Sequence, residues 1–199
     1  MKRKVLSLFL VVAMVLSLGI TVSAAEPSDD LSGAVVILHT NDVHGAIDGY
    51  AKAAALKKTY EDMGAYVLLM DAGDFSQGDP TVSASQGATA VELMNLAGYD
   101  LAAPGNHEFD YGYQNLSTLA KTAFEDNVTF TAPDGTKIGV FGLDTPETAT
   151  KAHPAKIQGV TFLSGDELVE CAQEQVDALE AEGCDVIVCL GHLGIDEES

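Results

Sequence analysis

The stretch AVVILHTNDVHG, residues 34–45, sets the pattern on which the rest of the chain is built. Its apolar first part predicts a buried β-strand over 34–40, which ends in a polar run. The same order returns in AYVLLMDAGD (65–74) and in YDLAAPGNHEFD (99–110), where a short strand runs into a polar loop. Near-continuous apolar strands of this kind are typical of the parallel sheets of α/β proteins.

Helical patterns fill the segments between these strands. The Ala- and Lys-rich run 49–64 closes at a glycine, as does 87–98, and 113–124 also has helical spacing. A long amphipathic pattern follows at 164–184, for which Ser164 is the expected N-cap. The alternation of strand and helix predicts an α/β architecture that is parallel in part.

Two further β signals belong to the second half of the chain. VTFTAPDGTKIGVFGLD (128–144) has two β-rich runs around a Pro-Asp-Gly-Thr turn, which predicts an antiparallel hairpin. DVIVCLGHLG (185–194) predicts another buried strand, with Cys189 as a small buried hydrophobe. The three cysteines form no disulfide framework and lack the spacing of a zinc-thiolate site. A bridge between Cys171 and Cys184 stays open, although the predicted helix gives it poor geometry.

The N-terminus has the features of a secretory signal peptide. A basic segment is followed by the apolar run Val5–Ile20 and by a small-residue site that predicts cleavage after Ala24. We expect residues 1–24 to be a signal peptide and 25–33 a linker, and the protein to be secreted, periplasmic or otherwise in the cell envelope. The alternative is a retained anchor, but the run is short for a membrane span. No second hydrophobic run of that length follows.

The charge balance excludes one class of partner. The net charge is −20, and it becomes three units more negative if Lys2, Arg3 and Lys4 are removed. So acidic a chain lacks the basic patches that bind nucleic acid. An anionic small-molecule substrate would need local positive charge, and a metal ion is the obvious source because basic residues are scarce.

Polar and titratable residues gather where four of the predicted strands end. They are Asn41, Asp42 and His44; Asp71, Gly73, Asp74, Ser76, Gln77 and Gly78; Asn106, His107, Glu108 and Asp110; and His192. In open α/β sheets, sites form outside the carboxyl ends of the strands. Asp42, Asp74 and Asn106 follow one another at equal steps of 32 residues, about one βαβ unit. We therefore expect the first three clusters to lie side by side along one sheet edge.

The chemistry of these clusters indicates a metal site. They offer carboxylates, imidazoles and an amide, a mixture of oxygen and nitrogen donors that suits zinc, manganese, iron or cobalt. The donors exceed what one four-coordinate ion needs. Asp74, central in the row, can bridge two ions about 3.5–4 Å apart, as in two-metal phosphatases.

Four motifs carry a family resemblance: ILHTNDVHG (37–45), DAGDFSQG (71–78), GNHEFDYG (105–112) and LGHLG (190–194). With these motifs in this order, the chain resembles the 5′-nucleotidase branch of the calcineurin-like metallophosphoesterases. That branch includes UDP-sugar hydrolases and 2′,3′-cyclic-nucleotide phosphodiesterases. The resemblance covers Val35–Gly194 and implies a layered sandwich of mixed β-sheets flanked by helices. Residues 34–199 would be the N-terminal part of the catalytic domain.

The resemblance also implies a role for each motif residue. Metal ligands would be Asp42 and His44 for one ion, Asp74 for both ions, and Asn106 and His192 for the second. His107 would not bind metal; it would face the substrate phosphate and stabilise charge or protonate the leaving oxygen, while Asp110 orients its imidazole. A metal-activated water would attack phosphorus in line. Gly73, Gly78 and Gly105 would allow tight turns and close backbone approach.

Each of these residues has a simpler interpretation when taken alone. The acids could form ordinary turns, and the histidines could be surface or capping residues. Their joint occurrence at strand ends favours the metal site. Elsewhere, we expect His39 to pack or to support a ligand, and His153 to be solvated. Glu108 and Asp71 are expected to be structural or to support ligands.

The sequence departs from the family pattern in three places. It has no Gly-His-x-His motif and no C-terminal nucleoside-binding domain, and it ends at GIDEES. Helix 113–124 also runs directly into EDNVTF (125–130), where the family usually has another strand and loop. We therefore expect part of a longer enzyme, a sandwich incomplete at its C-terminus, with weak metal binding and little activity on its own.

These features support one leading function and leave alternatives. The leading hypothesis is a secreted, metal-dependent phosphoester hydrolase that acts on nucleotides through two divalent ions. A same-fold alternative is another branch of the family, such as a sulfur-oxidation component or a UDP-sugar hydrolase. An alternative from a different class is a non-catalytic secreted binding protein on the same scaffold. A degenerate binder would be expected to have lost some site residues, and this chain has kept them.

Overall fold

The computed structural model describes residues 30–120 and 125–194. The expected signal peptide and the end of predicted helix 113–124 lie outside the described residues. The strands are β1 (Val35–Thr40), β2 (Tyr66–Asp71), β3 (Leu101–Ala102), β4 (Asn127–Thr131), β5 (Lys137–Asp144) and β6 (Val186–His192). The helices are α2 (Asp48–Asp62), α3 (Pro80–Ala84), α4 (Ala88–Ala97), α5 (Tyr113–Ala120), α6 (Thr148–Lys151) and α7 (Asp166–Ala181), with a 3₁₀ helix η1 (Asn106–Phe109).

The first sheet has the strand order β1-β2-β3 and is parallel. β1 pairs with β2 from Val35↔Tyr66 to Thr40↔Asp71, and β3 pairs with β2 through two residues. Because the three strands run in one direction, their carboxyl ends meet at the same edge. The loops that follow them therefore lie side by side, as the equal sequence spacing predicted.

The second sheet has the order β4-β5-β6 and is mixed. β4 and β5 form the predicted antiparallel hairpin, whose turn is tightened by the Thr136 N–H donating to Asp134 Oδ1 at 2.9 Å. β6 is parallel to β5, and Asp144 pairs with His192 at their carboxyl ends. This pairing brings the last predicted cluster to the end of the second sheet.

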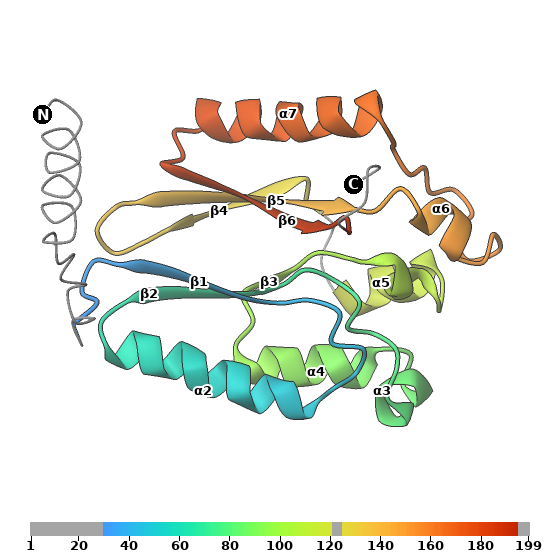
Figure 1. Cartoon of the computed structure of the whole chain (residues 1–199), viewed down its shortest axis with the longest axis horizontal. Helices are drawn as coiled ribbons and strands as arrows, with labels where there is room; N and C mark the ends of the chain where they lie inside the picture. The colour runs from blue at the N-terminus through green and yellow to red at the C-terminus, as the bar shows by residue number, and fades with distance from the viewer. Residues whose placement is uncertain (1–29, 121–124, 195–199) are drawn as a thin grey trace, which may run out of the picture. The chain divides into compact units, whose positions relative to one another are not determined.

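The two sheets stack face to face between helices (Figure 1). Helices α2 and α4 cover the outer face of the first sheet, and α7 covers the outer face of the second. The buried core between the sheets consists of Leu68, Met70, Ala72, Ala103, Ala132, Ile138, Val140 and Leu190. The fold is the layered α/β sandwich expected from the sequence.

Burial differs from expectation on the two outer strands. β2, in the middle of its sheet, is buried from Val67 onward, but β1 and β6 are edge strands and are only partly buried. His39 and Cys189 are exposed, so their predicted packing is wrong. Alternate residues of a strand face opposite sides: in β6, Leu190 faces the core between the sheets and Cys189 the other side. All three cysteines are free.

The helix ends agree with the glycine signals but not with the predicted serine cap. Gly98 ends α4 in the left-handed conformation, with φ at 79°. α7 begins after Gly165 with no side-chain cap, so the expected role of Ser164 is wrong. α3 and α6 were not predicted, because helices of four or five residues are too short to show a periodic pattern.

Among the described helices, none has the length and apolarity needed to cross a bilayer.

A cavity of about 710 Å³ lies beside β3, between α4, α5 and the second sheet. Apolar side chains form much of its wall, including Phe75, Met94, Leu116 and Val140. Within the described residues, β3 has a strand partner on one side and no strand lies between α5 and β4. The further strand that the family resemblance implied between α5 and β4 is thus not found among the described residues.

Candidate active site

Three of the predicted ligands have an unusual backbone conformation. Asp42, His44 and Asp74 have φ angles of 52°, 44° and 61°. Residues with a side chain seldom adopt positive φ, although Asp, Asn and His tolerate it best. In the described chain, Gln86 is the one other non-glycine residue in this region. Since backbone strain gathers at functional sites, its coincidence with the predicted ligands supports a site here.

Glycines let the three polar loops approach one another at backbone distance. A Cβ atom at Gly78 would lie 2.0 Å from the carbonyl oxygen of His44. One at Gly73 would lie 2.6 Å from the nitrogen of Gly105, and one at Gly105 would lie 2.5 Å from Oδ1 of Asp74. These contacts confirm that glycine is needed for close approach at all three positions.

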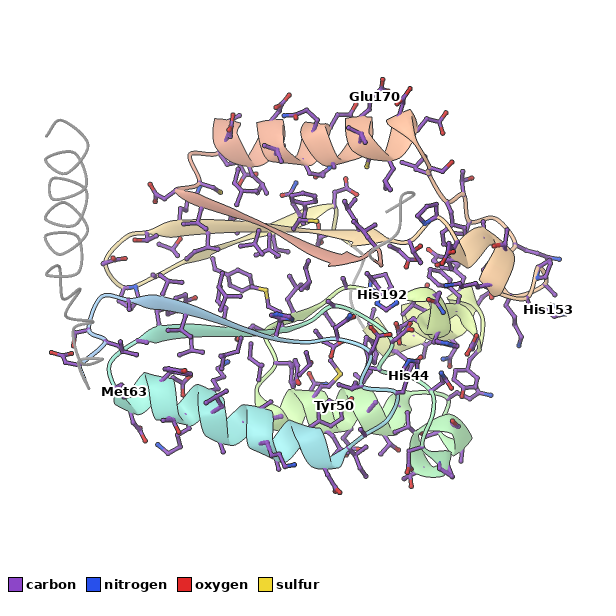
Figure 2. The ribbon with its side chains drawn as sticks, viewed as in Figure 1. His44, Tyr50, Met63, His153, Glu170 and His192 are labelled. Carbon is purple, nitrogen blue, oxygen red and sulfur yellow. The ribbon has the colours of Figure 1, made fainter. Side chains whose placement is uncertain are left out.

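Asp74 lies at the centre of the ligand cluster. It is 2% exposed, and its Oδ2 lies 3.3 Å from Nε2 of His192 and 3.8 Å from Nε2 of His44. Nε2 of His44 lies 3.5 Å from Oδ1 of Asp42. Figure 2 shows His44 and His192 at the same end of the two sheets. The structure thus brings four of the five predicted ligands into one group.

Hydrogen bonds to Nδ1 orient two of these imidazoles. Nδ1 of His192 lies 3.0 Å from the carbonyl oxygen of Ala72 and 3.0 Å from Oδ1 of Asn41. Both partners are acceptors, so Nδ1 carries a hydrogen and Nε2 is directed at the cluster as the potential ligand atom. The side-chain amide of Gln77 lies 2.9 Å from Nδ1 of His44. The atom that faces Nδ1 is the amide nitrogen of Gln77, a donor, so Nδ1 accepts in this arrangement. For Nε2 of His44 to bind a cation, the Gln77 amide would turn so that its oxygen accepts from Nδ1–H.

The pKa values of Asp74 and His192 shift in opposite directions. Burial raises the pKa of Asp74, but the contact with His192 and the bond from the His107 N–H outweigh it and lower this pKa below its ordinary value. Asp74 raises the pKa of His192 to about 9, against the effect of burial. The cluster therefore favours positive charge, and a divalent cation would replace the proton of His192.

His107 and Asp110 form a hydrogen-bonded pair beside the cluster. Nδ1 of His107 lies 2.7 Å from Oδ2 of Asp110, and the His107 N–H donates to Oδ1 of Asp74 at 2.8 Å. The His107 ring lies 5.1 Å from the ring of His44 in an edge-to-face arrangement. The His107 side chain is 34% exposed, so a substrate can reach it.

Asn106 is the predicted ligand that the structure joins least to the others. It begins η1 directly before His107 and is half-buried. Within the described residues, no hydrogen bond or ion pair links its amide to the other predicted ligands. Its role as a ligand stays a prediction.

The donor atoms fall into two groups that share Asp74. Donor atoms of Asp42, Asp74 and His192 lie within 4.8 Å of one another, and so do those of His44, Asp74 and His107. Mixed carboxylate and imidazole donors suit divalent transition metals. The residues present fit the binding of divalent metal. His107, predicted to face the substrate, also lies within reach of the second group.

Comparison with known proteins agrees with this arrangement. Residues 35–198 match the calcineurin-like phosphoesterase family. The chain belongs to this family. It is 32% identical over 201 residues to a 5′-nucleotidase of Diplobatis ommata, over 82% of this chain and 34% of that protein. It is 28% identical over 223 residues to the trifunctional nucleotide phosphoesterase protein YfkN of Bacillus subtilis, over 86% of this chain and 15% of that protein.

The phosphoesterase fold is also found among solved structures. The 5′-nucleotidase precursor of Thermus thermophilus has a TM-score of 0.68 and 28% identity, over 79% of this chain and 37% of that one. The chain spans 34% of the length of the Diplobatis 5′-nucleotidase. It therefore spans about a third of the length of these two 5′-nucleotidase relatives.

Some residues near the candidate site were given no role from the sequence. Asn41 and Gln77 orient the histidines described above. Asp144 ends β5 opposite His192, and burial raises its pKa to about 7. Its position at a strand end was the available signal, the same one that identified the other clusters. His153, by contrast, lies on the exposed surface near α6, as expected (Figure 2).

Proposed function

We propose that this chain is the catalytic core of a secreted, metal-dependent hydrolase of nucleotide phosphoesters. The activity would be of the 5′-nucleotidase type, or of the related 2′,3′-cyclic-nucleotide phosphodiesterase or UDP-sugar hydrolase type. The main support is the convergence of Asp42, His44 and His192 on Asp74, next to the His107–Asp110 pair. The relatives named as 5′-nucleotidases support the nucleotide substrate. The N-terminal pattern supports secretion.

Two divalent cations would be held by this chain's own side chains. Asp42 and His44, whose donor atoms lie 3.5 Å apart, would bind one, His192 and Asn106 the other, and Asp74 both. This assignment differs from the grouping of the donor atoms in the structure, where Asp42 lies with His192 and Asp74. When bound, such cations lower the pKa of water and neutralise phosphate oxygens. They would supply the positive charge that the acidic chain lacks.

The His107–Asp110 pair would handle the proton of the leaving group. Asp110 accepts the Nδ1 hydrogen of His107 and so fixes the ring, which leaves Nε2 for the substrate. A protonated His107 would stabilise charge on the phosphate and donate its Nε2 proton to the leaving oxygen. A non-catalytic binding protein has no need of this oriented pair.

The test is hydrolysis of AMP and of bis-(p-nitrophenyl) phosphate, with metal content measured on the same sample. His107→Ala should lower turnover by roughly 10²–10⁴-fold and leave metal content intact. His153→Ala is the matched control, because His153 is exposed and lies away from the cluster. Loss of metal in the His107→Ala variant would contradict the assigned role.

The level of activity is itself a proposal. This chain offers five ligand candidates for two ions and contains no Gly-His-x-His motif. We therefore expect weak metal binding and low turnover from residues 1–199 alone. Two tightly bound ions together with robust turnover would contradict this expectation.

A further inference from the structure

The buried carboxylate of Glu108 connects two of the loops that form the site. Glu108 is 1% exposed, although it directly follows the half-exposed His107. Its Oε2 accepts from the N–H of Asp74 at 2.7 Å and from the N–H of Gly105 at 2.7 Å. Its Oε1 accepts from the N–H groups of Phe75 and Ser76, both at 2.9 Å.

These four bonds use the whole acceptor capacity of the carboxylate, which has about four lone-pair sites. Glu108 therefore has no lone pair left for a cation, although it lies among predicted ligands. Its bonds run instead to two loops: residues 74–76 follow β2, and Gly105 precedes η1. A single side chain thus ties the loop of the shared ligand to the loop of Asn106 and His107.

Two further hydrogen bonds join these loops. The His107 N–H donates to Oδ1 of Asp74, and the Ser76 hydroxyl donates to the His107 carbonyl oxygen at 3.2 Å. Asp74 itself has a strained positive φ of 61°. Such a conformation persists only where the surroundings hold it. The bonds from Glu108 to the N–H groups at 74, 75 and 76 are well placed to do so.

We propose that Glu108 is a positioning residue that sets the orientation of Asp74 relative to Asn106 and His107, and so sets the affinity for divalent cations. The proposal rests on the proposed metal site. Both its charge and its reach matter, because it must accept from three N–H groups on the loop after β2 and from one N–H group on the loop before η1 at once.

The test measures Mn²⁺ binding without substrate, from the electron paramagnetic resonance signal of free Mn²⁺. Glu108→Asp keeps the charge but is one methylene too short to reach both loops. Glu108→Gln keeps the length but presents an NH₂ group to N–H donors. Both variants should bind Mn²⁺ roughly 10–100-fold more weakly than the unmodified chain. Glu170→Gln, at an exposed position on α7 (Figure 2), is the matched control and should not change binding.

Glu108→Asp tests whether the position of the carboxylate matters, because it keeps the charge and changes the position. If Glu108→Asp folds and binds Mn²⁺ within about twofold of the unmodified chain, a range far below the expected effect, the proposal is wrong. If neither variant folds, amide hydrogen exchange of the unmodified, metal-free chain decides. Slow exchange at Asp74, Phe75, Ser76 and Gly105 supports the proposal, and exchange as fast as in an unstructured peptide overturns it. If the unmodified chain binds no Mn²⁺, the proposed metal site fails, and the exchange experiment still tests the four bonds.

Discussion

Nε2 of His192 lies 3.3 Å from Oδ2 of Asp74, although the two residues belong to different sheets. Asp74 follows β2 in the first sheet, and His192 ends β6 in the second. This contact therefore joins the two layers at the candidate site. It also places a carboxylate against an imidazole in a buried position, where charge interactions are strong.

The first prediction concerns the titration of this pair in metal-free protein. Asp74 raises the pKa of His192 from 6.5 to about 9. A pKa raised on folding adds stability that is fully present below the unfolded value and lost as pH rises through the folded value. The contribution of His192 should therefore be complete below about pH 6.5 and lost as the pH rises through about 9.

Asp74→Asn should move the His192 titration back toward its ordinary range. NMR titration of the imidazole in the presence of a chelator measures this directly. Urea unfolding at pH 6 and pH 9.5 should show a smaller difference in the variant than in the unmodified chain. An unchanged His192 midpoint in Asp74→Asn would show that Asp74 is not the cause of the shift.

The second prediction concerns Asp71, beneath the site. Asp71 is fully buried, accepts from the Gly73 N–H and the Thr40 hydroxyl, and has its pKa raised from 3.8 to about 7 by burial. Between these values the folded state binds more protons than the unfolded state. Stability should therefore fall as pH rises from about 4 through 7, by at most about 4 kcal/mol from this group.

Asp71→Asn removes this titration and keeps the shape of the side chain. The difference in unfolding free energy between pH 5 and pH 8 should shrink by at least about 1 kcal/mol. Asp62→Asn, at an exposed position on α2, should leave the difference nearly unchanged. An Asp71→Asn variant with the original pH dependence would show that another group, such as Asp144, dominates it.

The third prediction separates steric fit from backbone conformation. Gly105 has an ordinary φ of −111°, but a Cβ atom there would lie 2.5 Å from Oδ1 of Asp74 and 2.9 Å from Cγ of His192. Gly105→Ala should weaken Mn²⁺ binding by at least about tenfold and destabilise the fold by about 1–3 kcal/mol. Gly49→Ala, in α2 with open space around it, should leave binding unchanged and stabilise by up to about 1 kcal/mol. Unaltered Mn²⁺ affinity in Gly105→Ala would mean that Asp74 and His192 can shift to make room for the methyl group without weakening metal binding.

Much of the fold and the grouping of site residues could be predicted from sequence, because both follow from local pattern. Apolar runs of strand length alternate with helical runs, and this alternation fixes parallel pairing in the first sheet. Since parallel strands end at one edge, the equal spacing of Asp42, Asp74 and Asn106 placed their loops side by side. Asp74 is central because β2 is the middle strand.

Burial and fine contacts could not be predicted, because they depend on neighbours distant in sequence. Cys189 and His39 have apolar surroundings in sequence, but each lies on an edge strand and is exposed. The contacts of Asn41 with His192 and of Gln77 with His44 need loops that turn through positive φ. The order of residues along the chain does not by itself give such dihedral angles.

The last prediction concerns the contribution of Asp110 to catalysis. Asp110 lies 2.7 Å from Nδ1 of His107 and is outside the two groups of donor atoms. Asp110→Asn should therefore lower turnover of bis-(p-nitrophenyl) phosphate, by roughly 10-fold or more and less than His107→Ala, while Mn²⁺ affinity stays the same. The physical reason is that a neutral amide stabilises the protonated imidazole less than a carboxylate does. Nitrogen-15 NMR of the His107 ring provides a readout independent of activity, because the tautomer held by Asp110 should become mixed in the variant. Equal turnover with a changed ring signal would remove His107 from proton transfer, and reduced Mn²⁺ affinity would place Asp110 with the ligands instead.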